Sequence, residues 1–491
     1  MNKKNYVAVA TLAVAMLTSC AGQKEAKSTS GIDLANMDTT VSAGTDFFRY
    51  ACGGWNDAHP LTAEYSRYGT FDELFENSQK QLRELIEGLA AQKNNQAGSA
   101  AQKIGDLYNM AMDSVTLNKQ GAEPVKAMLD KIAGMKDKSE IVPMMTEMAH
   151  IGIGTYFHSY VYADPKNSSL NIFQMGQGGI NLGEKEYYLD TDSITQNIRE
   201  QYKLYIGKLF QLAGFSEADA QQKVADVMEI ETDIAKVSRS ATELRDPEAN
   251  YHKMSFDELK KTIAGIDWDA YMKGLGIQAP AELNVEQVEP IQEVARLMNT
   301  LPLSKHVSYL EYNLLDAAAS CLSDDFVAAR FDFYGKVLSG RQVNQPRWKR
   351  AVNSVNGMLG ELVGEMYVEK YFPAAAKERM VKLVKNLQTA LGERIDAQEW
   401  MSDSTKIRAH EKLAAFHVKV GYPDKWKDYS KLEIKNDSYW ANVCRASEWG
   451  FNDMYSRIGK PVDKDEWLMT PQTVNAYYNP STNEICFPAA I

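Results

Sequence analysis

Apolar side chains recur at every third or fourth position along most of the chain, and this spacing predicts α-helices. In the segment from Phe71 to Leu89 the apolar positions form one stripe, with Asp, Glu, Gln and Lys on the opposite face. Similar stripes occupy Ile104–Ala111 and the segments 224–237, 358–371 and 377–401. The last of these follows Pro373, a suitable helix-start residue, and its apolar positions are Val381, Leu383, Val384, Leu387 and Leu391. We expect all of these stripes to pack into a hydrophobic core.

Two regions depart from the helical spacing and predict β-structure. Tyr156–Tyr162 and Leu170–Met175 are aromatic, β-branched and partly alternating, and the turn-forming segment 164–167 separates them. The segment 473–488 is the second β region, with a turn at Asn479-Pro480. The predicted fold is therefore mainly α, and α+β overall: a large helical domain with minor β-hairpins.

The N-terminal residues read as a targeting segment rather than as part of the fold. A short basic stretch precedes the apolar run Val7–Leu17, which is too short to span a bilayer comfortably, so residues 1–19 are predicted to be a signal peptide. Cys20 stands in a sequence that resembles a bacterial lipobox and would become the lipidated first residue; a plain secretory signal is the alternative. Residues 20–40 would form a flexible tether. We expect an exported lipoprotein, anchored in a membrane and facing the periplasm or the cell exterior.

Composition narrows the choice of partners. The chain has 491 residues, enough for more than one domain, and a formal net charge of −11, which argues against nucleic acid as a partner. Four cysteines remain besides Cys20, and they show no C-x-x-C pairing and no metal-like clustering: Cys52, Cys321, Cys444 and Cys486. Export permits disulfides but does not define their connectivity. No feature of the sequence indicates an oligomeric state.

The histidines offer no metal site by their spacing. The chain has seven histidines, and no two of them stand at i and i+4 on one helix. His410 and Glu411 match the first two positions of the zinc-peptidase motif H-E-x-x-H, but Ala414 stands where the second histidine would be. No nucleophile elbow, P-loop or dinucleotide fingerprint is present either. The sequence therefore predicts no catalytic residue and no metal ligand within this chain.

Eight short blocks, in order along the chain, carry a resemblance to a known family. They are Asp46–Trp55, Tyr65–Asp72, Gln177–Leu182 with Tyr187–Leu189, Leu244–Pro247 with Tyr251, Pro346–Lys349, Trp400–Met401 with Thr405–Lys406 and Glu411–Leu413, Gly421–Trp426, and Val474–Ile491. Together they resemble the neprilysin / endothelin-converting-enzyme family of zinc metallopeptidases. The resemblance runs from about residue 38 to residue 491.

The resemblance implies a fold and an activity. Residues 41–470 would be a helical domain that caps a thermolysin-like catalytic domain, and residues 471–491 would be the first strands of that catalytic domain. A closed cavity between the two would restrict substrates to peptides of modest size. In the family an H-E-x-x-H zinc motif follows shortly after the segment that ends here at Ile491, so we expect this chain to lack the zinc site and to be inactive alone. Zinc is expected for the complete enzyme.

The resemblance also assigns residues. Asn475 and Ala476 match the family's substrate-binding pair: an edge strand can take up an extended peptide, and an Asn side chain can clamp one peptide unit. The alternative is an ordinary hairpin whose Asn caps a turn. Arg67 matches an arginine near the primed-side subsites, and the alternative is a surface salt bridge with Asp72 or Glu73. Cys52 matches a position that forms a disulfide with the catalytic domain in many animal members.

Two functions follow, with a third as a weaker possibility. The first is a zinc-dependent metalloendopeptidase or oligopeptidase that cleaves peptides with a zinc-activated water. The alternative is a non-catalytic lipoprotein that binds peptides or a partner through the helical domain. A solute-binding lipoprotein is the third, but such proteins have two α/β lobes, and the helical run here argues against them.

Overall fold

The computed structural model describes residues 32–491 and divides them into two compact units. The predicted signal peptide, Cys20 and the first part of the tether lie outside the described residues. One unit ends at Thr62 and contains the short helix η1 (Leu34–Asn36) and helix α2 (Phe47–Ala58). Asp46 caps α2 by accepting a hydrogen bond from the Arg49 backbone N–H. The other unit, Ala63–Ile491, holds all the remaining elements.

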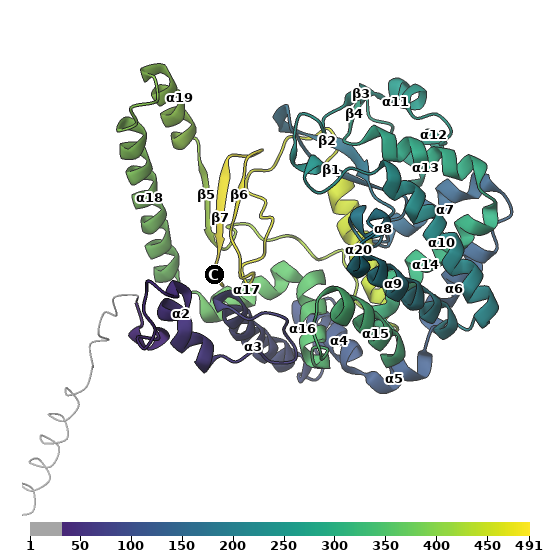
Figure 1. The fold of residues 1–491 in the computed structure, drawn as a ribbon, viewed down its shortest axis with the longest axis horizontal. Helices are drawn as coiled ribbons and strands as arrows, with labels where there is room; N and C mark the ends of the chain where they lie inside the picture. The colour runs from purple at the N-terminus through teal and green to yellow at the C-terminus, as the bar shows by residue number, and fades with distance from the viewer. Residues whose placement is uncertain (1–31) are drawn as a thin grey trace, which may run out of the picture. The chain divides into compact units, whose positions relative to one another are not determined.

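The larger unit is mostly helical (Figure 1). Its first helices are α3 (Thr70–Ala90), α4 (Ala100–Met112), α5 (Ser114–Gln120), α6 (Glu123–Ala133), η2 (Lys138–Glu140), α7 (Ile141–His150), α8 (Glu186–Leu189), α9 (Ser193–Leu212), α10 (Glu217–Val237), η3 (Glu243–Arg245), α11 (Phe256–Thr262) and α12 (Trp268–Gly274). The rest are α13 (Val288–Thr300), α14 (Leu303–Ala318), η4 (Ala319–Cys321), α15 (Asp324–Arg330), the π-helix η5 (Phe331–Leu338), α16 (Arg347–Met358), α17 (Gly360–Tyr371), α18 (Ala374–Asp396), α19 (Asp403–Ala414) and α20 (Tyr439–Tyr455). None of the helices within residues 32–491 is long and apolar enough to cross a membrane.

The core forms where α14 packs against α9 and α10. Helix α14 is buried nearly all round, which is typical of a central helix rather than of a surface helix. Tyr202 of α9, Ile230 of α10 and Leu310 of α14 are all completely buried. The prediction of a mainly helical fold is thus confirmed. The predicted segments 71–89 and 224–237 lie in α3 and α10, whereas the predicted segment 358–371 begins at the last residue of α16 and otherwise corresponds to α17.

Within residues 32–491, seven strands form two small sheets. The first sheet has the order β1-β2-β4-β3, with β1 (Phe157–Asp164), β2 (Asn167–Gln177), β3 (Lys253–Ser255) and β4 (Glu282–Val285). The β1–β2 hairpin confirms the predicted one, with Tyr160 opposite Gln174. The second sheet has the order β5-β7-β6, with β5 (His417–Gly421), β6 (Tyr477–Asn479) and β7 (Glu484–Pro488). The β6–β7 hairpin confirms the predicted turn after Asn479. Strands β3, β4 and β5 were not predicted.

Helix α18 differs from its prediction in length and in burial. It ends at Asp396 rather than at residue 401. Leu383, Leu387 and Leu391 are 48%, 56% and 47% exposed, so the expectation that they belong to the core was wrong. The buried side of α18 instead carries Val384 and Ile395, because α18 packs against β5 and α19 through that other face (Figure 1).

A completely buried carboxyl lies in the helical core. Glu231 of α10 accepts hydrogen bonds from the Tyr188 hydroxyl at 2.6 Å, the Asn181 amide at 2.6 Å and the Tyr202 hydroxyl at 2.9 Å. Burial raises the pKa of Glu231 to about 7, and these hydrogen bonds offset only part of that rise. The protonated form therefore favours folding.

We expect Glu231 to make stability fall with rising pH. Its folded-state pKa of about 7 lies above its ordinary value of 4.5, so its stabilising contribution is complete below pH 4.5 and is lost as pH rises through 7. Glu231→Gln should remove this loss, which amounts to up to about 3 kcal/mol. Denaturant unfolding at pH 5 and pH 8 measures the effect, with Glu369→Gln on the exposed face of α17 as the control. An equal pH dependence for the Glu231→Gln variant and the native protein would contradict the assignment.

Candidate functional site

The second sheet has three strands among the described residues, and its two edge strands are β5 and β6. β7 is the central strand: it pairs in parallel with β5, where Lys419 lies opposite Cys486, and antiparallel with β6, where Tyr478 lies opposite Ile485. Among the described residues β6 therefore has a partner on one side only. Its outer N–H and C=O groups can accept another extended chain as an added strand.

A buried ion pair and a hydrogen bond join the two outer strands of this sheet to its central strand. Lys419 of β5 and Glu484 of β7 lie 2.8 Å apart, and their side chains are 3% and 2% exposed. The Tyr477 hydroxyl of β6 donates a hydrogen bond of 2.8 Å to Glu484, and Lys419 also donates to the backbone carbonyl of Glu466. One carboxylate thus contacts side chains from both neighbouring strands.

Asn475 and Ala476 lie directly before β6. The loop that carries them is held against α17, because the Gln472 side-chain amide donates a hydrogen bond of 2.7 Å to the carbonyl of Gly360. Asn475 is exposed, and its Oδ1 accepts a hydrogen bond of 2.8 Å from the N–H of Ala476. Its Nδ2 donates to no described residue, so this N–H donor at the start of the free edge is available to a ligand. Ala476 is half-buried.

Arg67 lies in the segment that leads into α3. It is exposed and forms no ion pair with any residue in the described part of the chain. Asp72, one of the two partners considered for a salt bridge, instead accepts a hydrogen bond of 2.8 Å from the Gly69 N–H. No hydrogen bond or ion pair joins Arg67 to the β6–β7 hairpin among the described residues, so its substrate-binding role stays a prediction.

The described residues do not fit a zinc ion. Within residues 32–491 no three His, Cys, Asp or Glu side chains are grouped closely enough to hold a metal. His410 instead lies 2.8 Å from Asp396, and buried His306 hydrogen-bonds the Tyr156 hydroxyl at 2.8 Å. Burial lowers the pKa of His306 to about 4. The four cysteines in the described range, Cys52, Cys321, Cys444 and Cys486, form no disulfides with one another.

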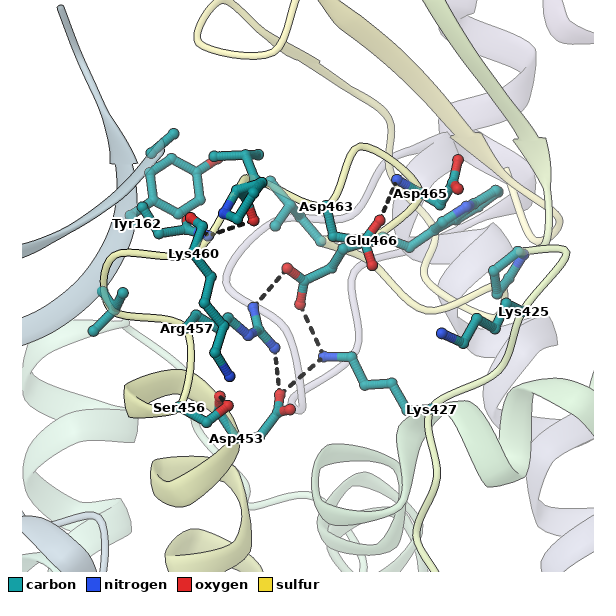
Figure 2. A pocket seen from close by; sticks show the side chains of 18 of the residues that line it. Tyr162, Lys425, Lys427, Asp453, Ser456, Arg457, Lys460, Asp463, Asp465 and Glu466 are labelled. Carbon is teal, nitrogen blue, oxygen red and sulfur yellow. Dashed lines mark hydrogen bonds and ion pairs between the residues drawn. The ribbon is translucent and has the colours of Figure 1, made fainter. Parts of the chain in front are cut away.

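A cavity of about 660 Å³ adjoins the sheet. Strand β1, the end of α20, the β6–β7 hairpin and the two loops 423–431 and 456–468 contribute its walls. Figure 2 shows an ion-pair network inside it: Glu466 contacts Lys427 at 3.1 Å and Arg457 at 2.6 Å, and Arg457 also pairs with Asp453.

No sequence pattern predicted this cavity. The charge-dense run 463–466 was a signal that could have drawn attention to it. That run alone does not reveal that α20 and the loop 423–431 face it.

Comparison with known proteins defines the class. The structure of the Mycobacterium tuberculosis zinc metalloprotease Zmp1 in complex with an inhibitor superimposes with a TM-score of 0.88 at 35% sequence identity, covering 94% of this chain and 70% of that one. PepO from Lactobacillus rhamnosis matches with a TM-score of 0.80 at 20% identity, covering 89% of this chain and 69% of that one, which supports the fold alone. The fold is that of a group of solved metalloproteases.

The chain belongs to peptidase family M13, whose sequence profile matches residues 43–423. Endothelin-converting enzyme 1 of Rattus norvegicus is 30% identical over 483 residues, which cover 93% of this chain and 62% of the rat protein. This chain therefore spans less than two thirds of the length of that relative. The resemblance to the neprilysin / endothelin-converting-enzyme family is confirmed. The division at residues 470 and 471 stays a prediction, and β5, which lies before that division, shares a sheet with β6 and β7.

We expect the buried ion pair to hold the sheet together. Lys419→Met leaves Glu484 buried without its cation, which should lower the free energy of unfolding by about 3–5 kcal/mol. In the double variant Lys419→Met/Glu484→Met no charge is left unpaired, so its loss should be clearly smaller. Denaturant unfolding of the native protein and both variants measures the difference. An equal loss in the single and double variants would contradict this role of the pair.

Proposed function

We propose that this protein is a zinc-dependent metalloendopeptidase that cleaves peptides of modest size. Membership of peptidase family M13 supports the reaction class, and the similar mycobacterial protein is named a zinc metalloprotease. The observation that carries the proposal is the free edge of β6, with the open Asn475 amide at its start.

In this proposal an extended peptide adds to β6 as a further strand. The backbone groups of β6 hydrogen-bond the peptide backbone, and the Asn475 Nδ2 donates to one substrate carbonyl. Ala476 leaves room for a substrate side chain because it carries only a methyl group. Arg67 presents a planar, permanently charged fork to the primed side of the substrate.

Zinc, when bound, would polarise the scissile carbonyl and activate a water. The described residues offer no donor set for it, so the roles assigned here to this chain are those of holding and orienting the substrate. The alternative function is a non-catalytic peptide- or partner-binding lipoprotein, which would bind through the helical domain without turnover.

We expect peptide hydrolysis that depends on zinc and on Asn475. A metal chelator should abolish cleavage of an unstructured peptide of about ten residues by the protein from its native cell, and added zinc should restore it. Asn475→Ala should lower kcat/KM about tenfold, because one neutral hydrogen bond to the substrate is lost. Asn386→Ala, at an exposed position of α18, is the matched control. Peptide binding without zinc-dependent hydrolysis would overturn the enzyme proposal in favour of the binding lipoprotein.

We also propose that Cys20 carries a lipid anchor, and that the anchored protein faces the periplasm or the cell exterior. The support is the sequence around Cys20, which resembles a lipobox and follows a signal-like apolar run. Several acyl chains on one cysteine anchor a protein far more firmly than one chain does. Cells fed a labelled fatty acid should incorporate label into the native protein but not into the Cys20→Ala variant. Absence of label from the native protein would leave the plain secretory signal as the better interpretation.

A further inference from the structure

The cavity beside the sheet contains one buried carboxyl that its surroundings do not neutralise. Glu361, near the start of α17, is 7% exposed and lines both this cavity and an adjoining one of about 350 Å³. Its Oε2 accepts a hydrogen bond of 2.7 Å from the backbone N–H of Lys427. Its Oε1 accepts no hydrogen bond from a described residue. This oxygen is also not completely buried. This oxygen therefore remains open to the cavity.

The other inner charges are already paired. Lys427 and Arg457 bind Glu466, and Arg457 also binds Asp453 (Figure 2). Glu484, which also lines the cavity, is neutralised by Lys419. In contrast, Glu361 has no cationic side chain within ion-pair distance among the described residues. The inner part of the cavity thus holds one carboxyl more than its cations can balance.

The charges at the rim do not change this balance. Three exposed lysines and three exposed aspartates complete the charged lining, namely Lys425, Lys431, Lys460, Asp428, Asp463 and Asp465. None of the three lysines forms an ion pair with a described residue. Their charges cancel those of the aspartates, so the unbalanced charge stays with Glu361.

Aromatic rings stand around the same space. Trp426, Trp449 and Trp467 line the cavity, and Trp449 and Trp467 also line the adjoining one. Trp449 is held in place by stacking on Tyr429, with the ring centroids 4.5 Å apart. Tryptophan faces attract cations, and they do so most strongly where water is excluded. A carboxylate and indole rings that line the same cavities are therefore an arrangement suited to a positively charged ligand.

We propose that this cavity binds an ammonium group of a peptide, with Glu361 as its anionic partner and the tryptophans as its walls. The ammonium could come from a lysine side chain or from a free N-terminus, which share the same chemistry. The identity of the ligand as a peptide rests on the proposed function, whereas the preference for a cation rests on the cavity alone. The β6–β7 hairpin forms one wall of this cavity, so the cavity would select peptides by charge while β6 holds their backbone.

Titration with small probes, followed by tryptophan fluorescence and calorimetry, tests the proposal. The first pair of probes is Nα-acetyl-lysine methylamide and its neutral counterpart Nα-acetyl-norleucine methylamide. The second pair is Ala-Ala amide, with a free N-terminus, and its N-acetylated form. At least one cationic probe should bind about tenfold or more tightly than its neutral counterpart, and the pair that responds identifies the source of the cation.

Glu361→Gln should remove that preference. The replacement keeps an oxygen that can accept the hydrogen bond from the Lys427 N–H, so the fold should persist. Glu365→Gln, one turn further along α17 and exposed, is the matched control and should bind as the native protein does. Circular dichroism and the unfolding temperature check both variants.

Equal binding of cationic and neutral probes by the native protein would overturn the proposal, and so would an undiminished preference in the Glu361→Gln variant. Failure of every probe to bind would overturn it as well. The first comparison needs no variant, so it remains decisive if Glu361→Gln fails to fold. Because the readout is binding of small amides, a failure of peptide hydrolysis would count against the proposed function and leave this result unaffected.

Discussion

The parallel pairing of β5 with β7 is the contact on which the candidate site depends. Parallel strands need a long crossover, and here the segment 422–483 makes it, with α20 at its middle and β6 near its end. The two loops of this crossover, 423–431 and 456–468, line the same cavity. Those loops supply Lys427 and Glu466 to the cavity. Near the end of the crossover, Asn475 lies just before β6, at the start of the free edge. The Lys419–Glu484 ion pair links the same two strands through their side chains.

Charge pairing distinguishes the structural groups of this region from those we assign to function. Lys419, Glu484 and the network around Arg457 have partners within hydrogen-bonding distance. Such buried pairs contribute little net stability compared with apolar residues, but removing one member leaves the other uncompensated, so they favour one arrangement of the chain. Glu361 and Asn475 differ, because each keeps a polar atom without a partner among the described residues. Open hydrogen-bonding capacity in an ordered setting is what a ligand can use.

Much of the fold could be predicted because local periodicity determines it. The stripe in α3 and the alternation in β1 and β2 need only neighbouring residues to be recognised. Strand β5 could not be found in this way, because it has five residues and its partner lies in a distant segment. Periodicity also reveals an amphipathic helix without revealing its partners, which is why Leu387 was expected in the core but is exposed. The substrate-binding roles of Asn475 and Arg67 were predicted from the family resemblance alone. From the sequence alone, the charged Glu361 would be expected on the surface of α17. Only the packing of the loop 423–431 shows that it is buried.

The most direct test of the central claim, that a peptide adds to the free edge of β6, is amide hydrogen exchange with and without a bound peptide. A peptide analogue that cannot be cleaved, added in excess to the native protein, would occupy the edge without turnover. We expect slower exchange in the segment 474–479, because outward-facing N–H groups of β6 gain hydrogen-bond partners. Slower exchange elsewhere in the chain, with 474–479 unchanged by a peptide that demonstrably binds, would contradict it.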